Sequence, residues 1–155
     1  MENQKIVNVE QMPVYQAFLG LALEVENVTR DCGPDFRWLR VQLLRSSESV
    51  CANMAEGFYS QYSTEYLQAL YRCRRESRET ITHLEYAGAT RQLSEIKVTS
   101  LQSRYQDALR QLANITSSIE RKIQERGKAK PGAVLKETEA EYSVQKDREA
   151  RTDSH

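Results

Sequence analysis

The stretch that decides the fold is YQDALRQLANITSSIERKI, residues 105–123. Its apolar residues follow one another at spacings of three, four, three, four and four: Tyr105, Ala108, Leu112, Ile115, Ile119 and Ile123. Residues at such spacings share one face of an α-helix. The pattern is close to a heptad repeat, so it predicts a helix that packs against its neighbours at a shallow crossing angle, as in a left-handed bundle.

Three segments upstream carry the same kind of apolar stripe. The first begins at Pro13, which suits the first turn of a helix, and ends at Cys32-Gly33-Pro34. The second is expected to start with Asp35 as N-cap and to end near Glu56, with Gly57 leaving the helix in a left-handed conformation. Ser63 and Ser94 are the expected N-caps of the third and fourth helices.

These segments predict an all-α domain over residues 13–126, flanked by an N-terminal arm (1–12) and a charged tail (127–155). Four amphipathic helices with short connections predict an antiparallel up-down-up-down four-helix bundle. Gly127 and the Pro-Gly pair that follows are expected to break the fourth helix. The tail has few apolar residues, and we expect it to be disordered or loosely helical.

Whole-chain charge gives no support to a nucleic-acid or anionic-membrane partner. Lys plus Arg and Asp plus Glu number 22 each, so the formal net charge is zero and only a local basic patch could attract a polyanion. The start of the chain lacks the apolar core of a signal peptide, and no apolar run approaches the ~18 residues that span a bilayer. We therefore expect a cytoplasmic protein with no membrane contact.

The residues of catalytic and metal sites are present but not in productive patterns. His83 has Glu79 four residues before it, whereas di-iron bundles use Glu-x-x-His. Cys51 and Cys73 lie on apolar stripes and are interpreted as reduced core residues. No glycine-rich phosphate loop is present. We therefore predict no catalytic residue, metal, cofactor or small-molecule substrate, and no enzyme.

Six residues near the apolar stripes are predicted to form a structural polar network: Arg45, Asn53, Glu56, Gly57, Arg74 and Glu79. A buried charge is costly unless it is paired. We therefore expect Glu56 to pair with Arg74 or Arg45, and Asn53 to bond to a neighbouring helix. The competing interpretation gives these residues a ligand-binding role.

A possible RNA or partner surface consists of Arg72, Arg75 and Arg78, at spacings of three along the third helix, with Tyr59 and Tyr62 near its start. Arginines interleaved with aromatic residues can neutralise and stack on RNA. Glu76 and Glu79 dilute this charge, and a solvated, salt-bridged helix face is the alternative explanation.

Three blocks carry a family resemblance: Gln42-Leu-Leu-Arg45, Ser49-Val-Cys-Ala-Asn53-Met-Ala-Glu56-Gly57-Phe58 and Ser63-Thr-Glu65. Over about residues 13–123 the chain resembles the four-helix-bundle proteins encoded in the intervening sequences of bacterial 23S ribosomal RNA genes. It departs from them at Cys51, where the family usually has Pro, and at Arg75-Glu76, where the family has Gly-Ser.

The resemblance implies a ring-shaped homo-oligomer, a homopentamer in that family. A related accessory bundle works beside the reverse transcriptase of diversity-generating retroelements. Trp38 and Leu44 are surplus to a thin core, and an assembly would bury them. We therefore expect a non-catalytic scaffold or accessory protein that binds RNA or a ribonucleoprotein enzyme such as a reverse transcriptase. The alternative is a purely structural oligomer with no nucleic-acid role.

Overall fold

The computed structural model describes residues 5–129, and within this range all regular secondary structure is helical. The α-helices are α1 (Pro13–Val28), α2 (Arg37–Phe58), α3 (Ser63–Ala89) and α4 (Glu95–Ala129). The short 3-10 helices are η1 (Val9–Gln11), η2 (Thr29–Asp31) and η3 (Pro34–Phe36). No helix in the described part of the chain is both long enough and apolar enough to cross a membrane.

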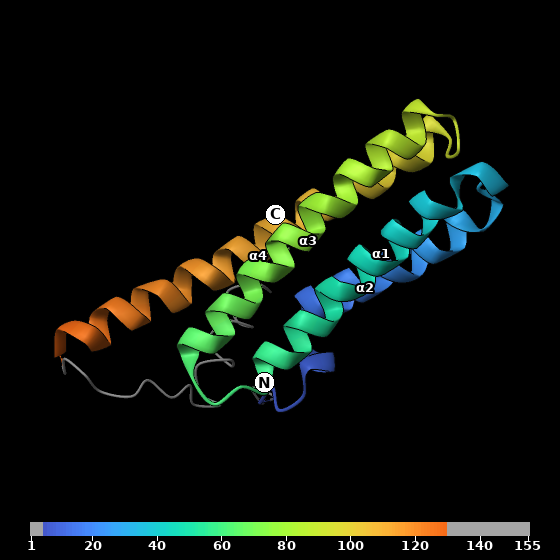
Figure 1. Cartoon of the computed structure of the whole chain (residues 1–155). Helices are drawn as coiled ribbons and strands as arrows, with labels where there is room; N and C mark the ends of the chain where they lie inside the picture. Colours follow the sequence, from blue (N-terminus) through green and yellow to red (C-terminus); the bar gives the residue numbers. More distant parts are fainter. Residues whose placement is uncertain (1–4, 130–155) are drawn as a thin grey trace.

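The four α-helices lie side by side in an elongated bundle (Figure 1). The second helix packs against α1 and α3, α3 packs against α4, and α4 returns to α1, which closes the bundle. Short turns join consecutive helices, so neighbours in sequence are antiparallel neighbours in space. The predicted up-down-up-down four-helix bundle is confirmed.

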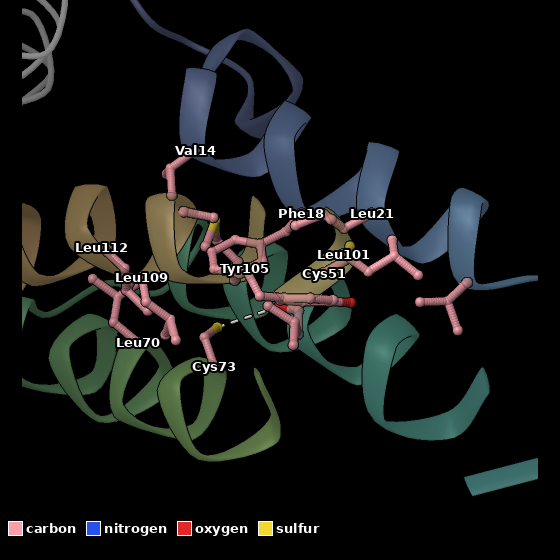
Figure 2. Packing of buried hydrophobic residues seen from close by; sticks show 14 of the residues in the cluster. Val14, Phe18, Leu21, Cys51, Leu70, Cys73, Leu101, Tyr105, Leu109 and Leu112 are labelled. Carbon is pink, nitrogen blue, oxygen red and sulfur yellow. Dashed lines mark hydrogen bonds between the residues drawn. The ribbon is translucent and has the colours of Figure 1, made fainter. Parts of the chain in front are cut away.

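The core consists of one apolar stripe from each helix. Figure 2 shows Phe18 of α1 and Tyr105 of α4 near its centre, with Cys51 and Cys73 close by on α2 and α3. The Phe18 and Tyr105 ring centroids lie 6.2 Å apart. Both cysteines are buried and reduced, as predicted. Large aromatic side chains at the centre supply much of the apolar area that this thin core buries.

Two of the four predicted helix starts are confirmed. Pro13 stands in the first turn of α1, and the Ser94 hydroxyl accepts a hydrogen bond of 3.3 Å from the backbone N–H of Lys97 in α4. The first-turn N–H groups of a helix lack intrahelical acceptors, which is why a serine is favourable there.

The predictions for Asp35 and Ser63 were wrong. Asp35 lies within η3, because the backbone N–H of Phe36 closes a turn on the Gly33 carbonyl at 2.9 Å. That extra turn moves the start of α2 to Arg37. Ser63 is itself the first residue of α3 and is buried. Neither helix has a side-chain hydrogen bond from its N-cap residue.

Gly57 does not end α2, which continues through Phe58. Its backbone φ is not in the left-handed region, so the predicted exit there was wrong. The glycine is required by packing instead. A Cβ atom at this position would lie 2.4 Å from the Cβ of Ala69 in α3 and 3.1 Å from the Tyr66 ring. The absence of a side chain therefore sets how closely α2 and α3 approach.

Arg91 takes the left-handed conformation, with φ of 63°, at the turn between α3 and α4. The backbone N–H of Gln92 bonds to the Ala87 carbonyl at 2.9 Å, and that of Arg91 bonds to Gly88 at 3.0 Å. These two bonds form a Schellman-type end of α3, in which glycine is the usual residue. The sequence pattern did not reveal this helix end, because an arginine occupies the left-handed position.

Residues on both sides of the predicted 13–126 range take part in the described bundle. The N-terminal arm packs on the bundle, since Ile6, Val9 and Met12 are buried. Gly127 does not break α4, which runs to Ala129 and extends past the other helices (Figure 1). One glycine near a helix end costs only ~1 kcal/mol. The rest of the predicted tail, residues 130–155, lies outside the described residues.

Replacing Gly57 by alanine is expected to destabilise the protein by about 1–3 kcal/mol, because the new methyl group overpacks the contact between α2 and α3. The measurement is the free energy of unfolding from urea denaturation. Gly20→Ala in α1 is the control, since a Cβ atom at that position would have no neighbour within 4 Å. That change is expected to stabilise the helix by about 0.5–1 kcal/mol. Equal effects of the two changes would contradict this role for Gly57.

Candidate functional site

An ion-pair cluster joins the middle of α2 to the middle of α3. Arg45 of α2 pairs with Glu79 of α3, and its Nη1 lies 3.4 Å from the Glu76 carboxylate. His83 Nε2 lies 3.4 Å from the Glu79 carboxylate, so the expected i,i+4 pair is present. Two of the six residues of the predicted polar network, Arg45 and Glu79, therefore meet in this cluster, which draws both carboxylates toward α2.

The pKa of Glu79 is lowered. Burial is the largest single influence and would raise it, but the hydrogen bonds with Arg45 and His83 and the positive charge of Arg45 act in the opposite direction, and the net shift is downward. The bond to Glu79 in turn raises the pKa of the Arg45 guanidinium. Both groups therefore stay charged over a wide pH range around neutrality.

Asn53 links the two helices as expected. Its side-chain oxygen accepts a hydrogen bond of 2.9 Å from Arg72 Nε, and its amide nitrogen donates to the Ser49 carbonyl at 2.8 Å. The partner is a residue that the sequence had assigned to the RNA surface. Arg72 is half-buried and bonded to a residue of α2, so its guanidinium is not freely available at that surface.

Glu56 forms no ion pair with any described residue, and its predicted pairing with Arg74 or Arg45 was wrong. Glu56 is exposed. Arg74 follows Arg72 by two residues, a turn of about 200° around the helix, so it faces away from α2. Its guanidinium lies over the Tyr71 ring, 4.9 Å from the centroid.

A hollow of about 350 Å³ lies between α2 and α3 near their connecting turn. Its lining residues are Glu56, Gly57, Ser60, Thr64, Glu65, Gln68, Ala69 and Arg72. The carboxylates of Glu56 and Glu65 line this hollow, and its one arginine, Arg72, is already bonded to Asn53. The hollow is therefore unfavourable for an anion. An anionic partner is better placed further along α3.

Three exposed arginines, Arg74, Arg75 and Arg78, define what we call the α3 arginine surface. None of the three forms an ion pair with another described residue. The neighbouring acids that could neutralise them, Glu76 and Glu79, are bound to Arg45 instead. Sequence alone left open a salt-bridged helix face, but in the described structure the acids of this face pair with Arg45 of α2 and not with these three arginines.

The two tyrosines predicted to join this surface do not. The exposed Tyr59 accepts a hydrogen bond of 3.2 Å from the backbone N–H of Val9, which fixes the N-terminal arm. Tyr62 is the N-cap residue of α3. Thirteen residues separate Tyr62 from Arg75, which is roughly 20 Å along a helix. Tyr71, which lies under Arg74, is the aromatic residue of the arginine surface.

The two buried cysteines, Cys51 and Cys73, are held as neutral thiols. Burial raises the pKa of Cys51 to about 11 and that of Cys73 to about 12. The Cys73 Sγ also lies 3.2 Å from the Val50 carbonyl, to which it donates. A thiolate is the nucleophilic form of cysteine, and it is disfavoured at both positions. No cluster of three or more His, Cys, Asp or Glu suited to a metal occurs among residues 5–129.

An apolar groove of about 620 Å³ runs along the outer side of α1 and α2. It is lined by Tyr15, Leu19, Ala22, Leu23, Glu26, Leu44, Arg45, Ser47, Glu48, Cys51, Ala52 and Ala55. Leu23 is 62 % exposed. The sequence pointed to Leu44 and Trp38 as surplus apolar residues but missed Leu19 and Leu23. Leu19 and Leu23 lie off the main apolar stripe of α1, and that position in the sequence could have identified them as exposed.

Replacing Glu79 by glutamine is expected to make the free energy of unfolding decrease less steeply as the pH is lowered. Because the folded pKa lies below the unfolded value of ~4.3, the ionised carboxylate stabilises the fold above that pH. This contribution disappears as the pH falls through the lowered pKa. At neutral pH the loss is at most ~1 kcal/mol, since the pair is partly exposed to solvent. Urea unfolding between pH 7 and pH 3 measures it.

The control is Glu85→Gln, which removes an exposed carboxylate of α3 that pairs with no described residue. Its pH dependence is expected to match that of the unmodified chain. If the free energy of unfolding of the Glu79→Gln variant varies with pH in parallel with that of the unmodified chain, Arg45 does not lower the pKa of Glu79.

Comparison with known proteins places this bundle in a family. No curated protein matches the chain. A crystal structure from Bacteroides thetaiotaomicron, of a protein of unknown function from the S23 ribosomal protein family, superposes with a TM-score of 0.63 at 22 % identity, covering 66 % of this chain and 97 % of that one. That likeness shows the shared fold. The family model for the 23S rRNA-intervening sequence protein matches residues 10–114, more than half of the sequence, and the chain therefore belongs to that family.

Proposed function

We propose that this chain is a non-catalytic scaffold that binds RNA, directly or within a ribonucleoprotein enzyme, and assembles with copies of itself. The observation that carries the RNA part is the α3 arginine surface. Its three guanidinium groups have no carboxylate partner among the described residues, although the chain as a whole has zero net charge. Local positive charge of this kind attracts phosphates independently of the overall balance.

The chemistry of the surface suits RNA better than a carboxylate-bearing protein. Arg75 and Arg78 are one helical turn apart and can contact successive phosphates of a single strand. Arg74, placed over the Tyr71 ring, presents a flat group on which a base can stack. The family name refers to intervening sequences of 23S rRNA, and this context supports an RNA partner.

The absence of catalysis is part of the proposal. Support comes from the raised pKa values of the Cys51 and Cys73 thiols, which disfavour the nucleophilic thiolate at both positions. The chain would then act through the surfaces it presents. Its partner could be RNA held by a larger enzyme such as a reverse transcriptase, and a reverse transcriptase gene beside this one would favour that accessory role.

Binding to a single-stranded RNA oligomer is expected to weaken steeply with salt. With about 0.7 counterions released per phosphate contact, three arginines predict a slope of about −2 in log K against log salt. Arg75→Ala combined with Arg78→Ala is expected to reduce that slope by about 1.4 and to lower affinity. Fluorescence anisotropy of a labelled RNA at several salt concentrations measures both.

The control, which removes one arginine from another surface, is Arg104→Ala. Arg104 is exposed on α4, and it lies two residues after Gln102, whose amide reaches the Ile81 carbonyl of α3. The intervening turn of about 200° puts Arg104 on the side of α4 away from α3. Its loss is expected to leave the salt slope within error. RNA binding that the double substitution leaves unchanged would refute the α3 arginine surface as the binding site. No binding of RNA at any salt concentration would leave only the purely structural oligomer.

The apolar groove along α1 and α2 supports the self-assembly part. An apolar surface of this extent on a soluble bundle favours burial against another protein surface. A second copy is the occupant that we propose, arranged as a ring. The resemblance to the intervening-sequence proteins suggests five copies, or five times the 17.9 kDa chain mass.

Sedimentation at micromolar concentration is expected to show a species heavier than the 17.9 kDa chain. Leu23→Glu, which places a charge in the groove, is expected to return the protein to that mass without loss of helical circular dichroism. Ile96→Glu is the control, because Ile96 is 83 % exposed at the start of α4 and lies outside the groove. A single species at the chain mass for the unmodified protein would refute assembly.

A further inference from the structure

A second basic site lies at the turn between α1 and α2, away from the α3 arginine surface. It is a hollow of about 510 Å³ lined by Arg30, Cys32, Pro34, Arg37, Arg40 and Val41. Three of these six residues are arginines and none is aromatic. We call this hollow the turn pocket.

The backbone explains how these arginines meet. Arg30 lies in η2 just after α1, and the chain then reverses through η3. Arg37 and Arg40 follow in the first turns of α2, three residues apart and so on one helix face. The reversal therefore brings guanidinium groups from two elements to one hollow, although they are spread over eleven residues of sequence.

The turn pocket has more positive than negative charge. Glu26 accepts hydrogen bonds from Arg30 at 2.8 and 3.0 Å and from Arg40 at 3.4 Å, so two arginines share one carboxylate. Arg37 pairs with no carboxylate among the described residues. Asp31 and Asp35 are close in sequence, but both are exposed and do not line the hollow.

Cys32 does not offset this charge. Burial raises the pKa of its thiol, even though Arg40 acts in the opposite direction, so the side chain is neutral at ordinary pH. The hydrogen bond from Arg30 lowers the pKa of Glu26, which remains ionised with its two arginines. The residual positive charge of the turn pocket is therefore that of Arg37 together with the incompletely neutralised Arg40.

Arg40 also carries a donor that the fold leaves unused. Its Nε atom is buried and has no hydrogen-bond partner in the described structure. The acceptor that best matches a guanidinium group is a planar carboxylate or a phosphate oxygen. In addition, the turn pocket adjoins the N-terminus of the 22-residue α2, whose N-cap residue Phe36 makes no side-chain hydrogen bond. The positive end of a helix dipole favours an anion at this place.

We propose that the turn pocket binds a phosphate group, with Arg37 and Arg40 as its principal ligands and Arg30 at its edge. Phosphate carries up to two negative charges and several acceptor oxygens, which suits guanidinium groups arriving from two directions. The hollow is larger than a phosphate ion and within the size range of small-ligand sites, so it has room for a phosphate ester. Because no aromatic residue lines it, the site recognises the phosphate and does not select a base.

The turn pocket is independent of the α3 arginine surface, and it stands whether or not that surface binds RNA. Its phosphate has two possible sources, a free phosphate or nucleotide and the backbone of a nucleic acid. Both share the same chemistry. A competition arm in the experiment separates them.

The experiment titrates inorganic phosphate, and then a nucleoside monophosphate, into the full-length protein at constant ionic strength maintained with chloride. Arginine Nε–H signals in NMR spectra report the site. Saturable shifts of the Arg37 and Arg40 signals are expected. Arg37→Gln is expected to weaken the binding at least fivefold, and Arg37→Gln with Arg40→Gln at least tenfold. Displacement of the nucleotide by an RNA lacking terminal phosphates identifies the backbone as a source, and no displacement identifies the free ester.

Arg75→Gln with Arg78→Gln removes the same number of charges from α3 and is the matched control, expected to leave phosphate affinity unchanged. Arg37 is exposed and without an ion pair, so its single substitution stays informative even if the change at Arg40 disturbs the fold. Shifts that do not saturate would overturn the proposal. Equal affinities in the turn-pocket variants and the α3 control would also overturn it.

Discussion

At Gly57 the backbone of α2 approaches α3 so closely that a methyl group would collide with Ala69, and the rest of the described structure depends on that contact. It brings the two helices within reach of polar side chains. Thr80 donates to Ser46 at 2.7 Å, Arg72 donates to Asn53 at 2.9 Å, and Arg45 reaches Glu76 and Glu79. These cross-links come from separate turns of both helices and fix their relative position along the bundle axis.

The same contact determines how charge is distributed on a chain with no net charge. The acids in the middle of α3 turn inward to Arg45, so Arg74, Arg75 and Arg78 remain on the outside without counter-ions from the described chain. At the far end of α2 a similar arrangement arises from one carboxylate, Glu26, shared between two arginines. In both places the positive surface results from where the acids are held. The number of basic residues alone would not produce it.

Sequence periodicity was enough to predict the four helices and their order, because burial of an apolar stripe is a property of each helix by itself. It failed where a feature depends on a neighbouring helix. Gly57 is one example, since its requirement comes from Ala69 and not from a turn. Glu56 is another, because whether Arg72 or Arg74 faces α2 depends on the rotation of α3, which spacing within one helix does not reveal. In the candidate site the exposure of Arg75 and Arg78 was predicted correctly, but the arginines of the turn pocket were missed because a chain reversal separates them in sequence.

The Ser46–Thr80 hydrogen bond, buried between α2 and α3, bears on the partner binding proposed above. Sliding α2 along α3 by one turn would break this bond together with the Asn53–Arg72 bond and the Arg45 ion pairs. These bonds therefore favour one register of α2 against α3. The described bundle is therefore a stiff body whose surface groups keep a fixed spacing. Docking of the proposed partner on such a body would involve little coupled folding, and its calorimetric signature would be a small heat-capacity change that reflects only the area covered.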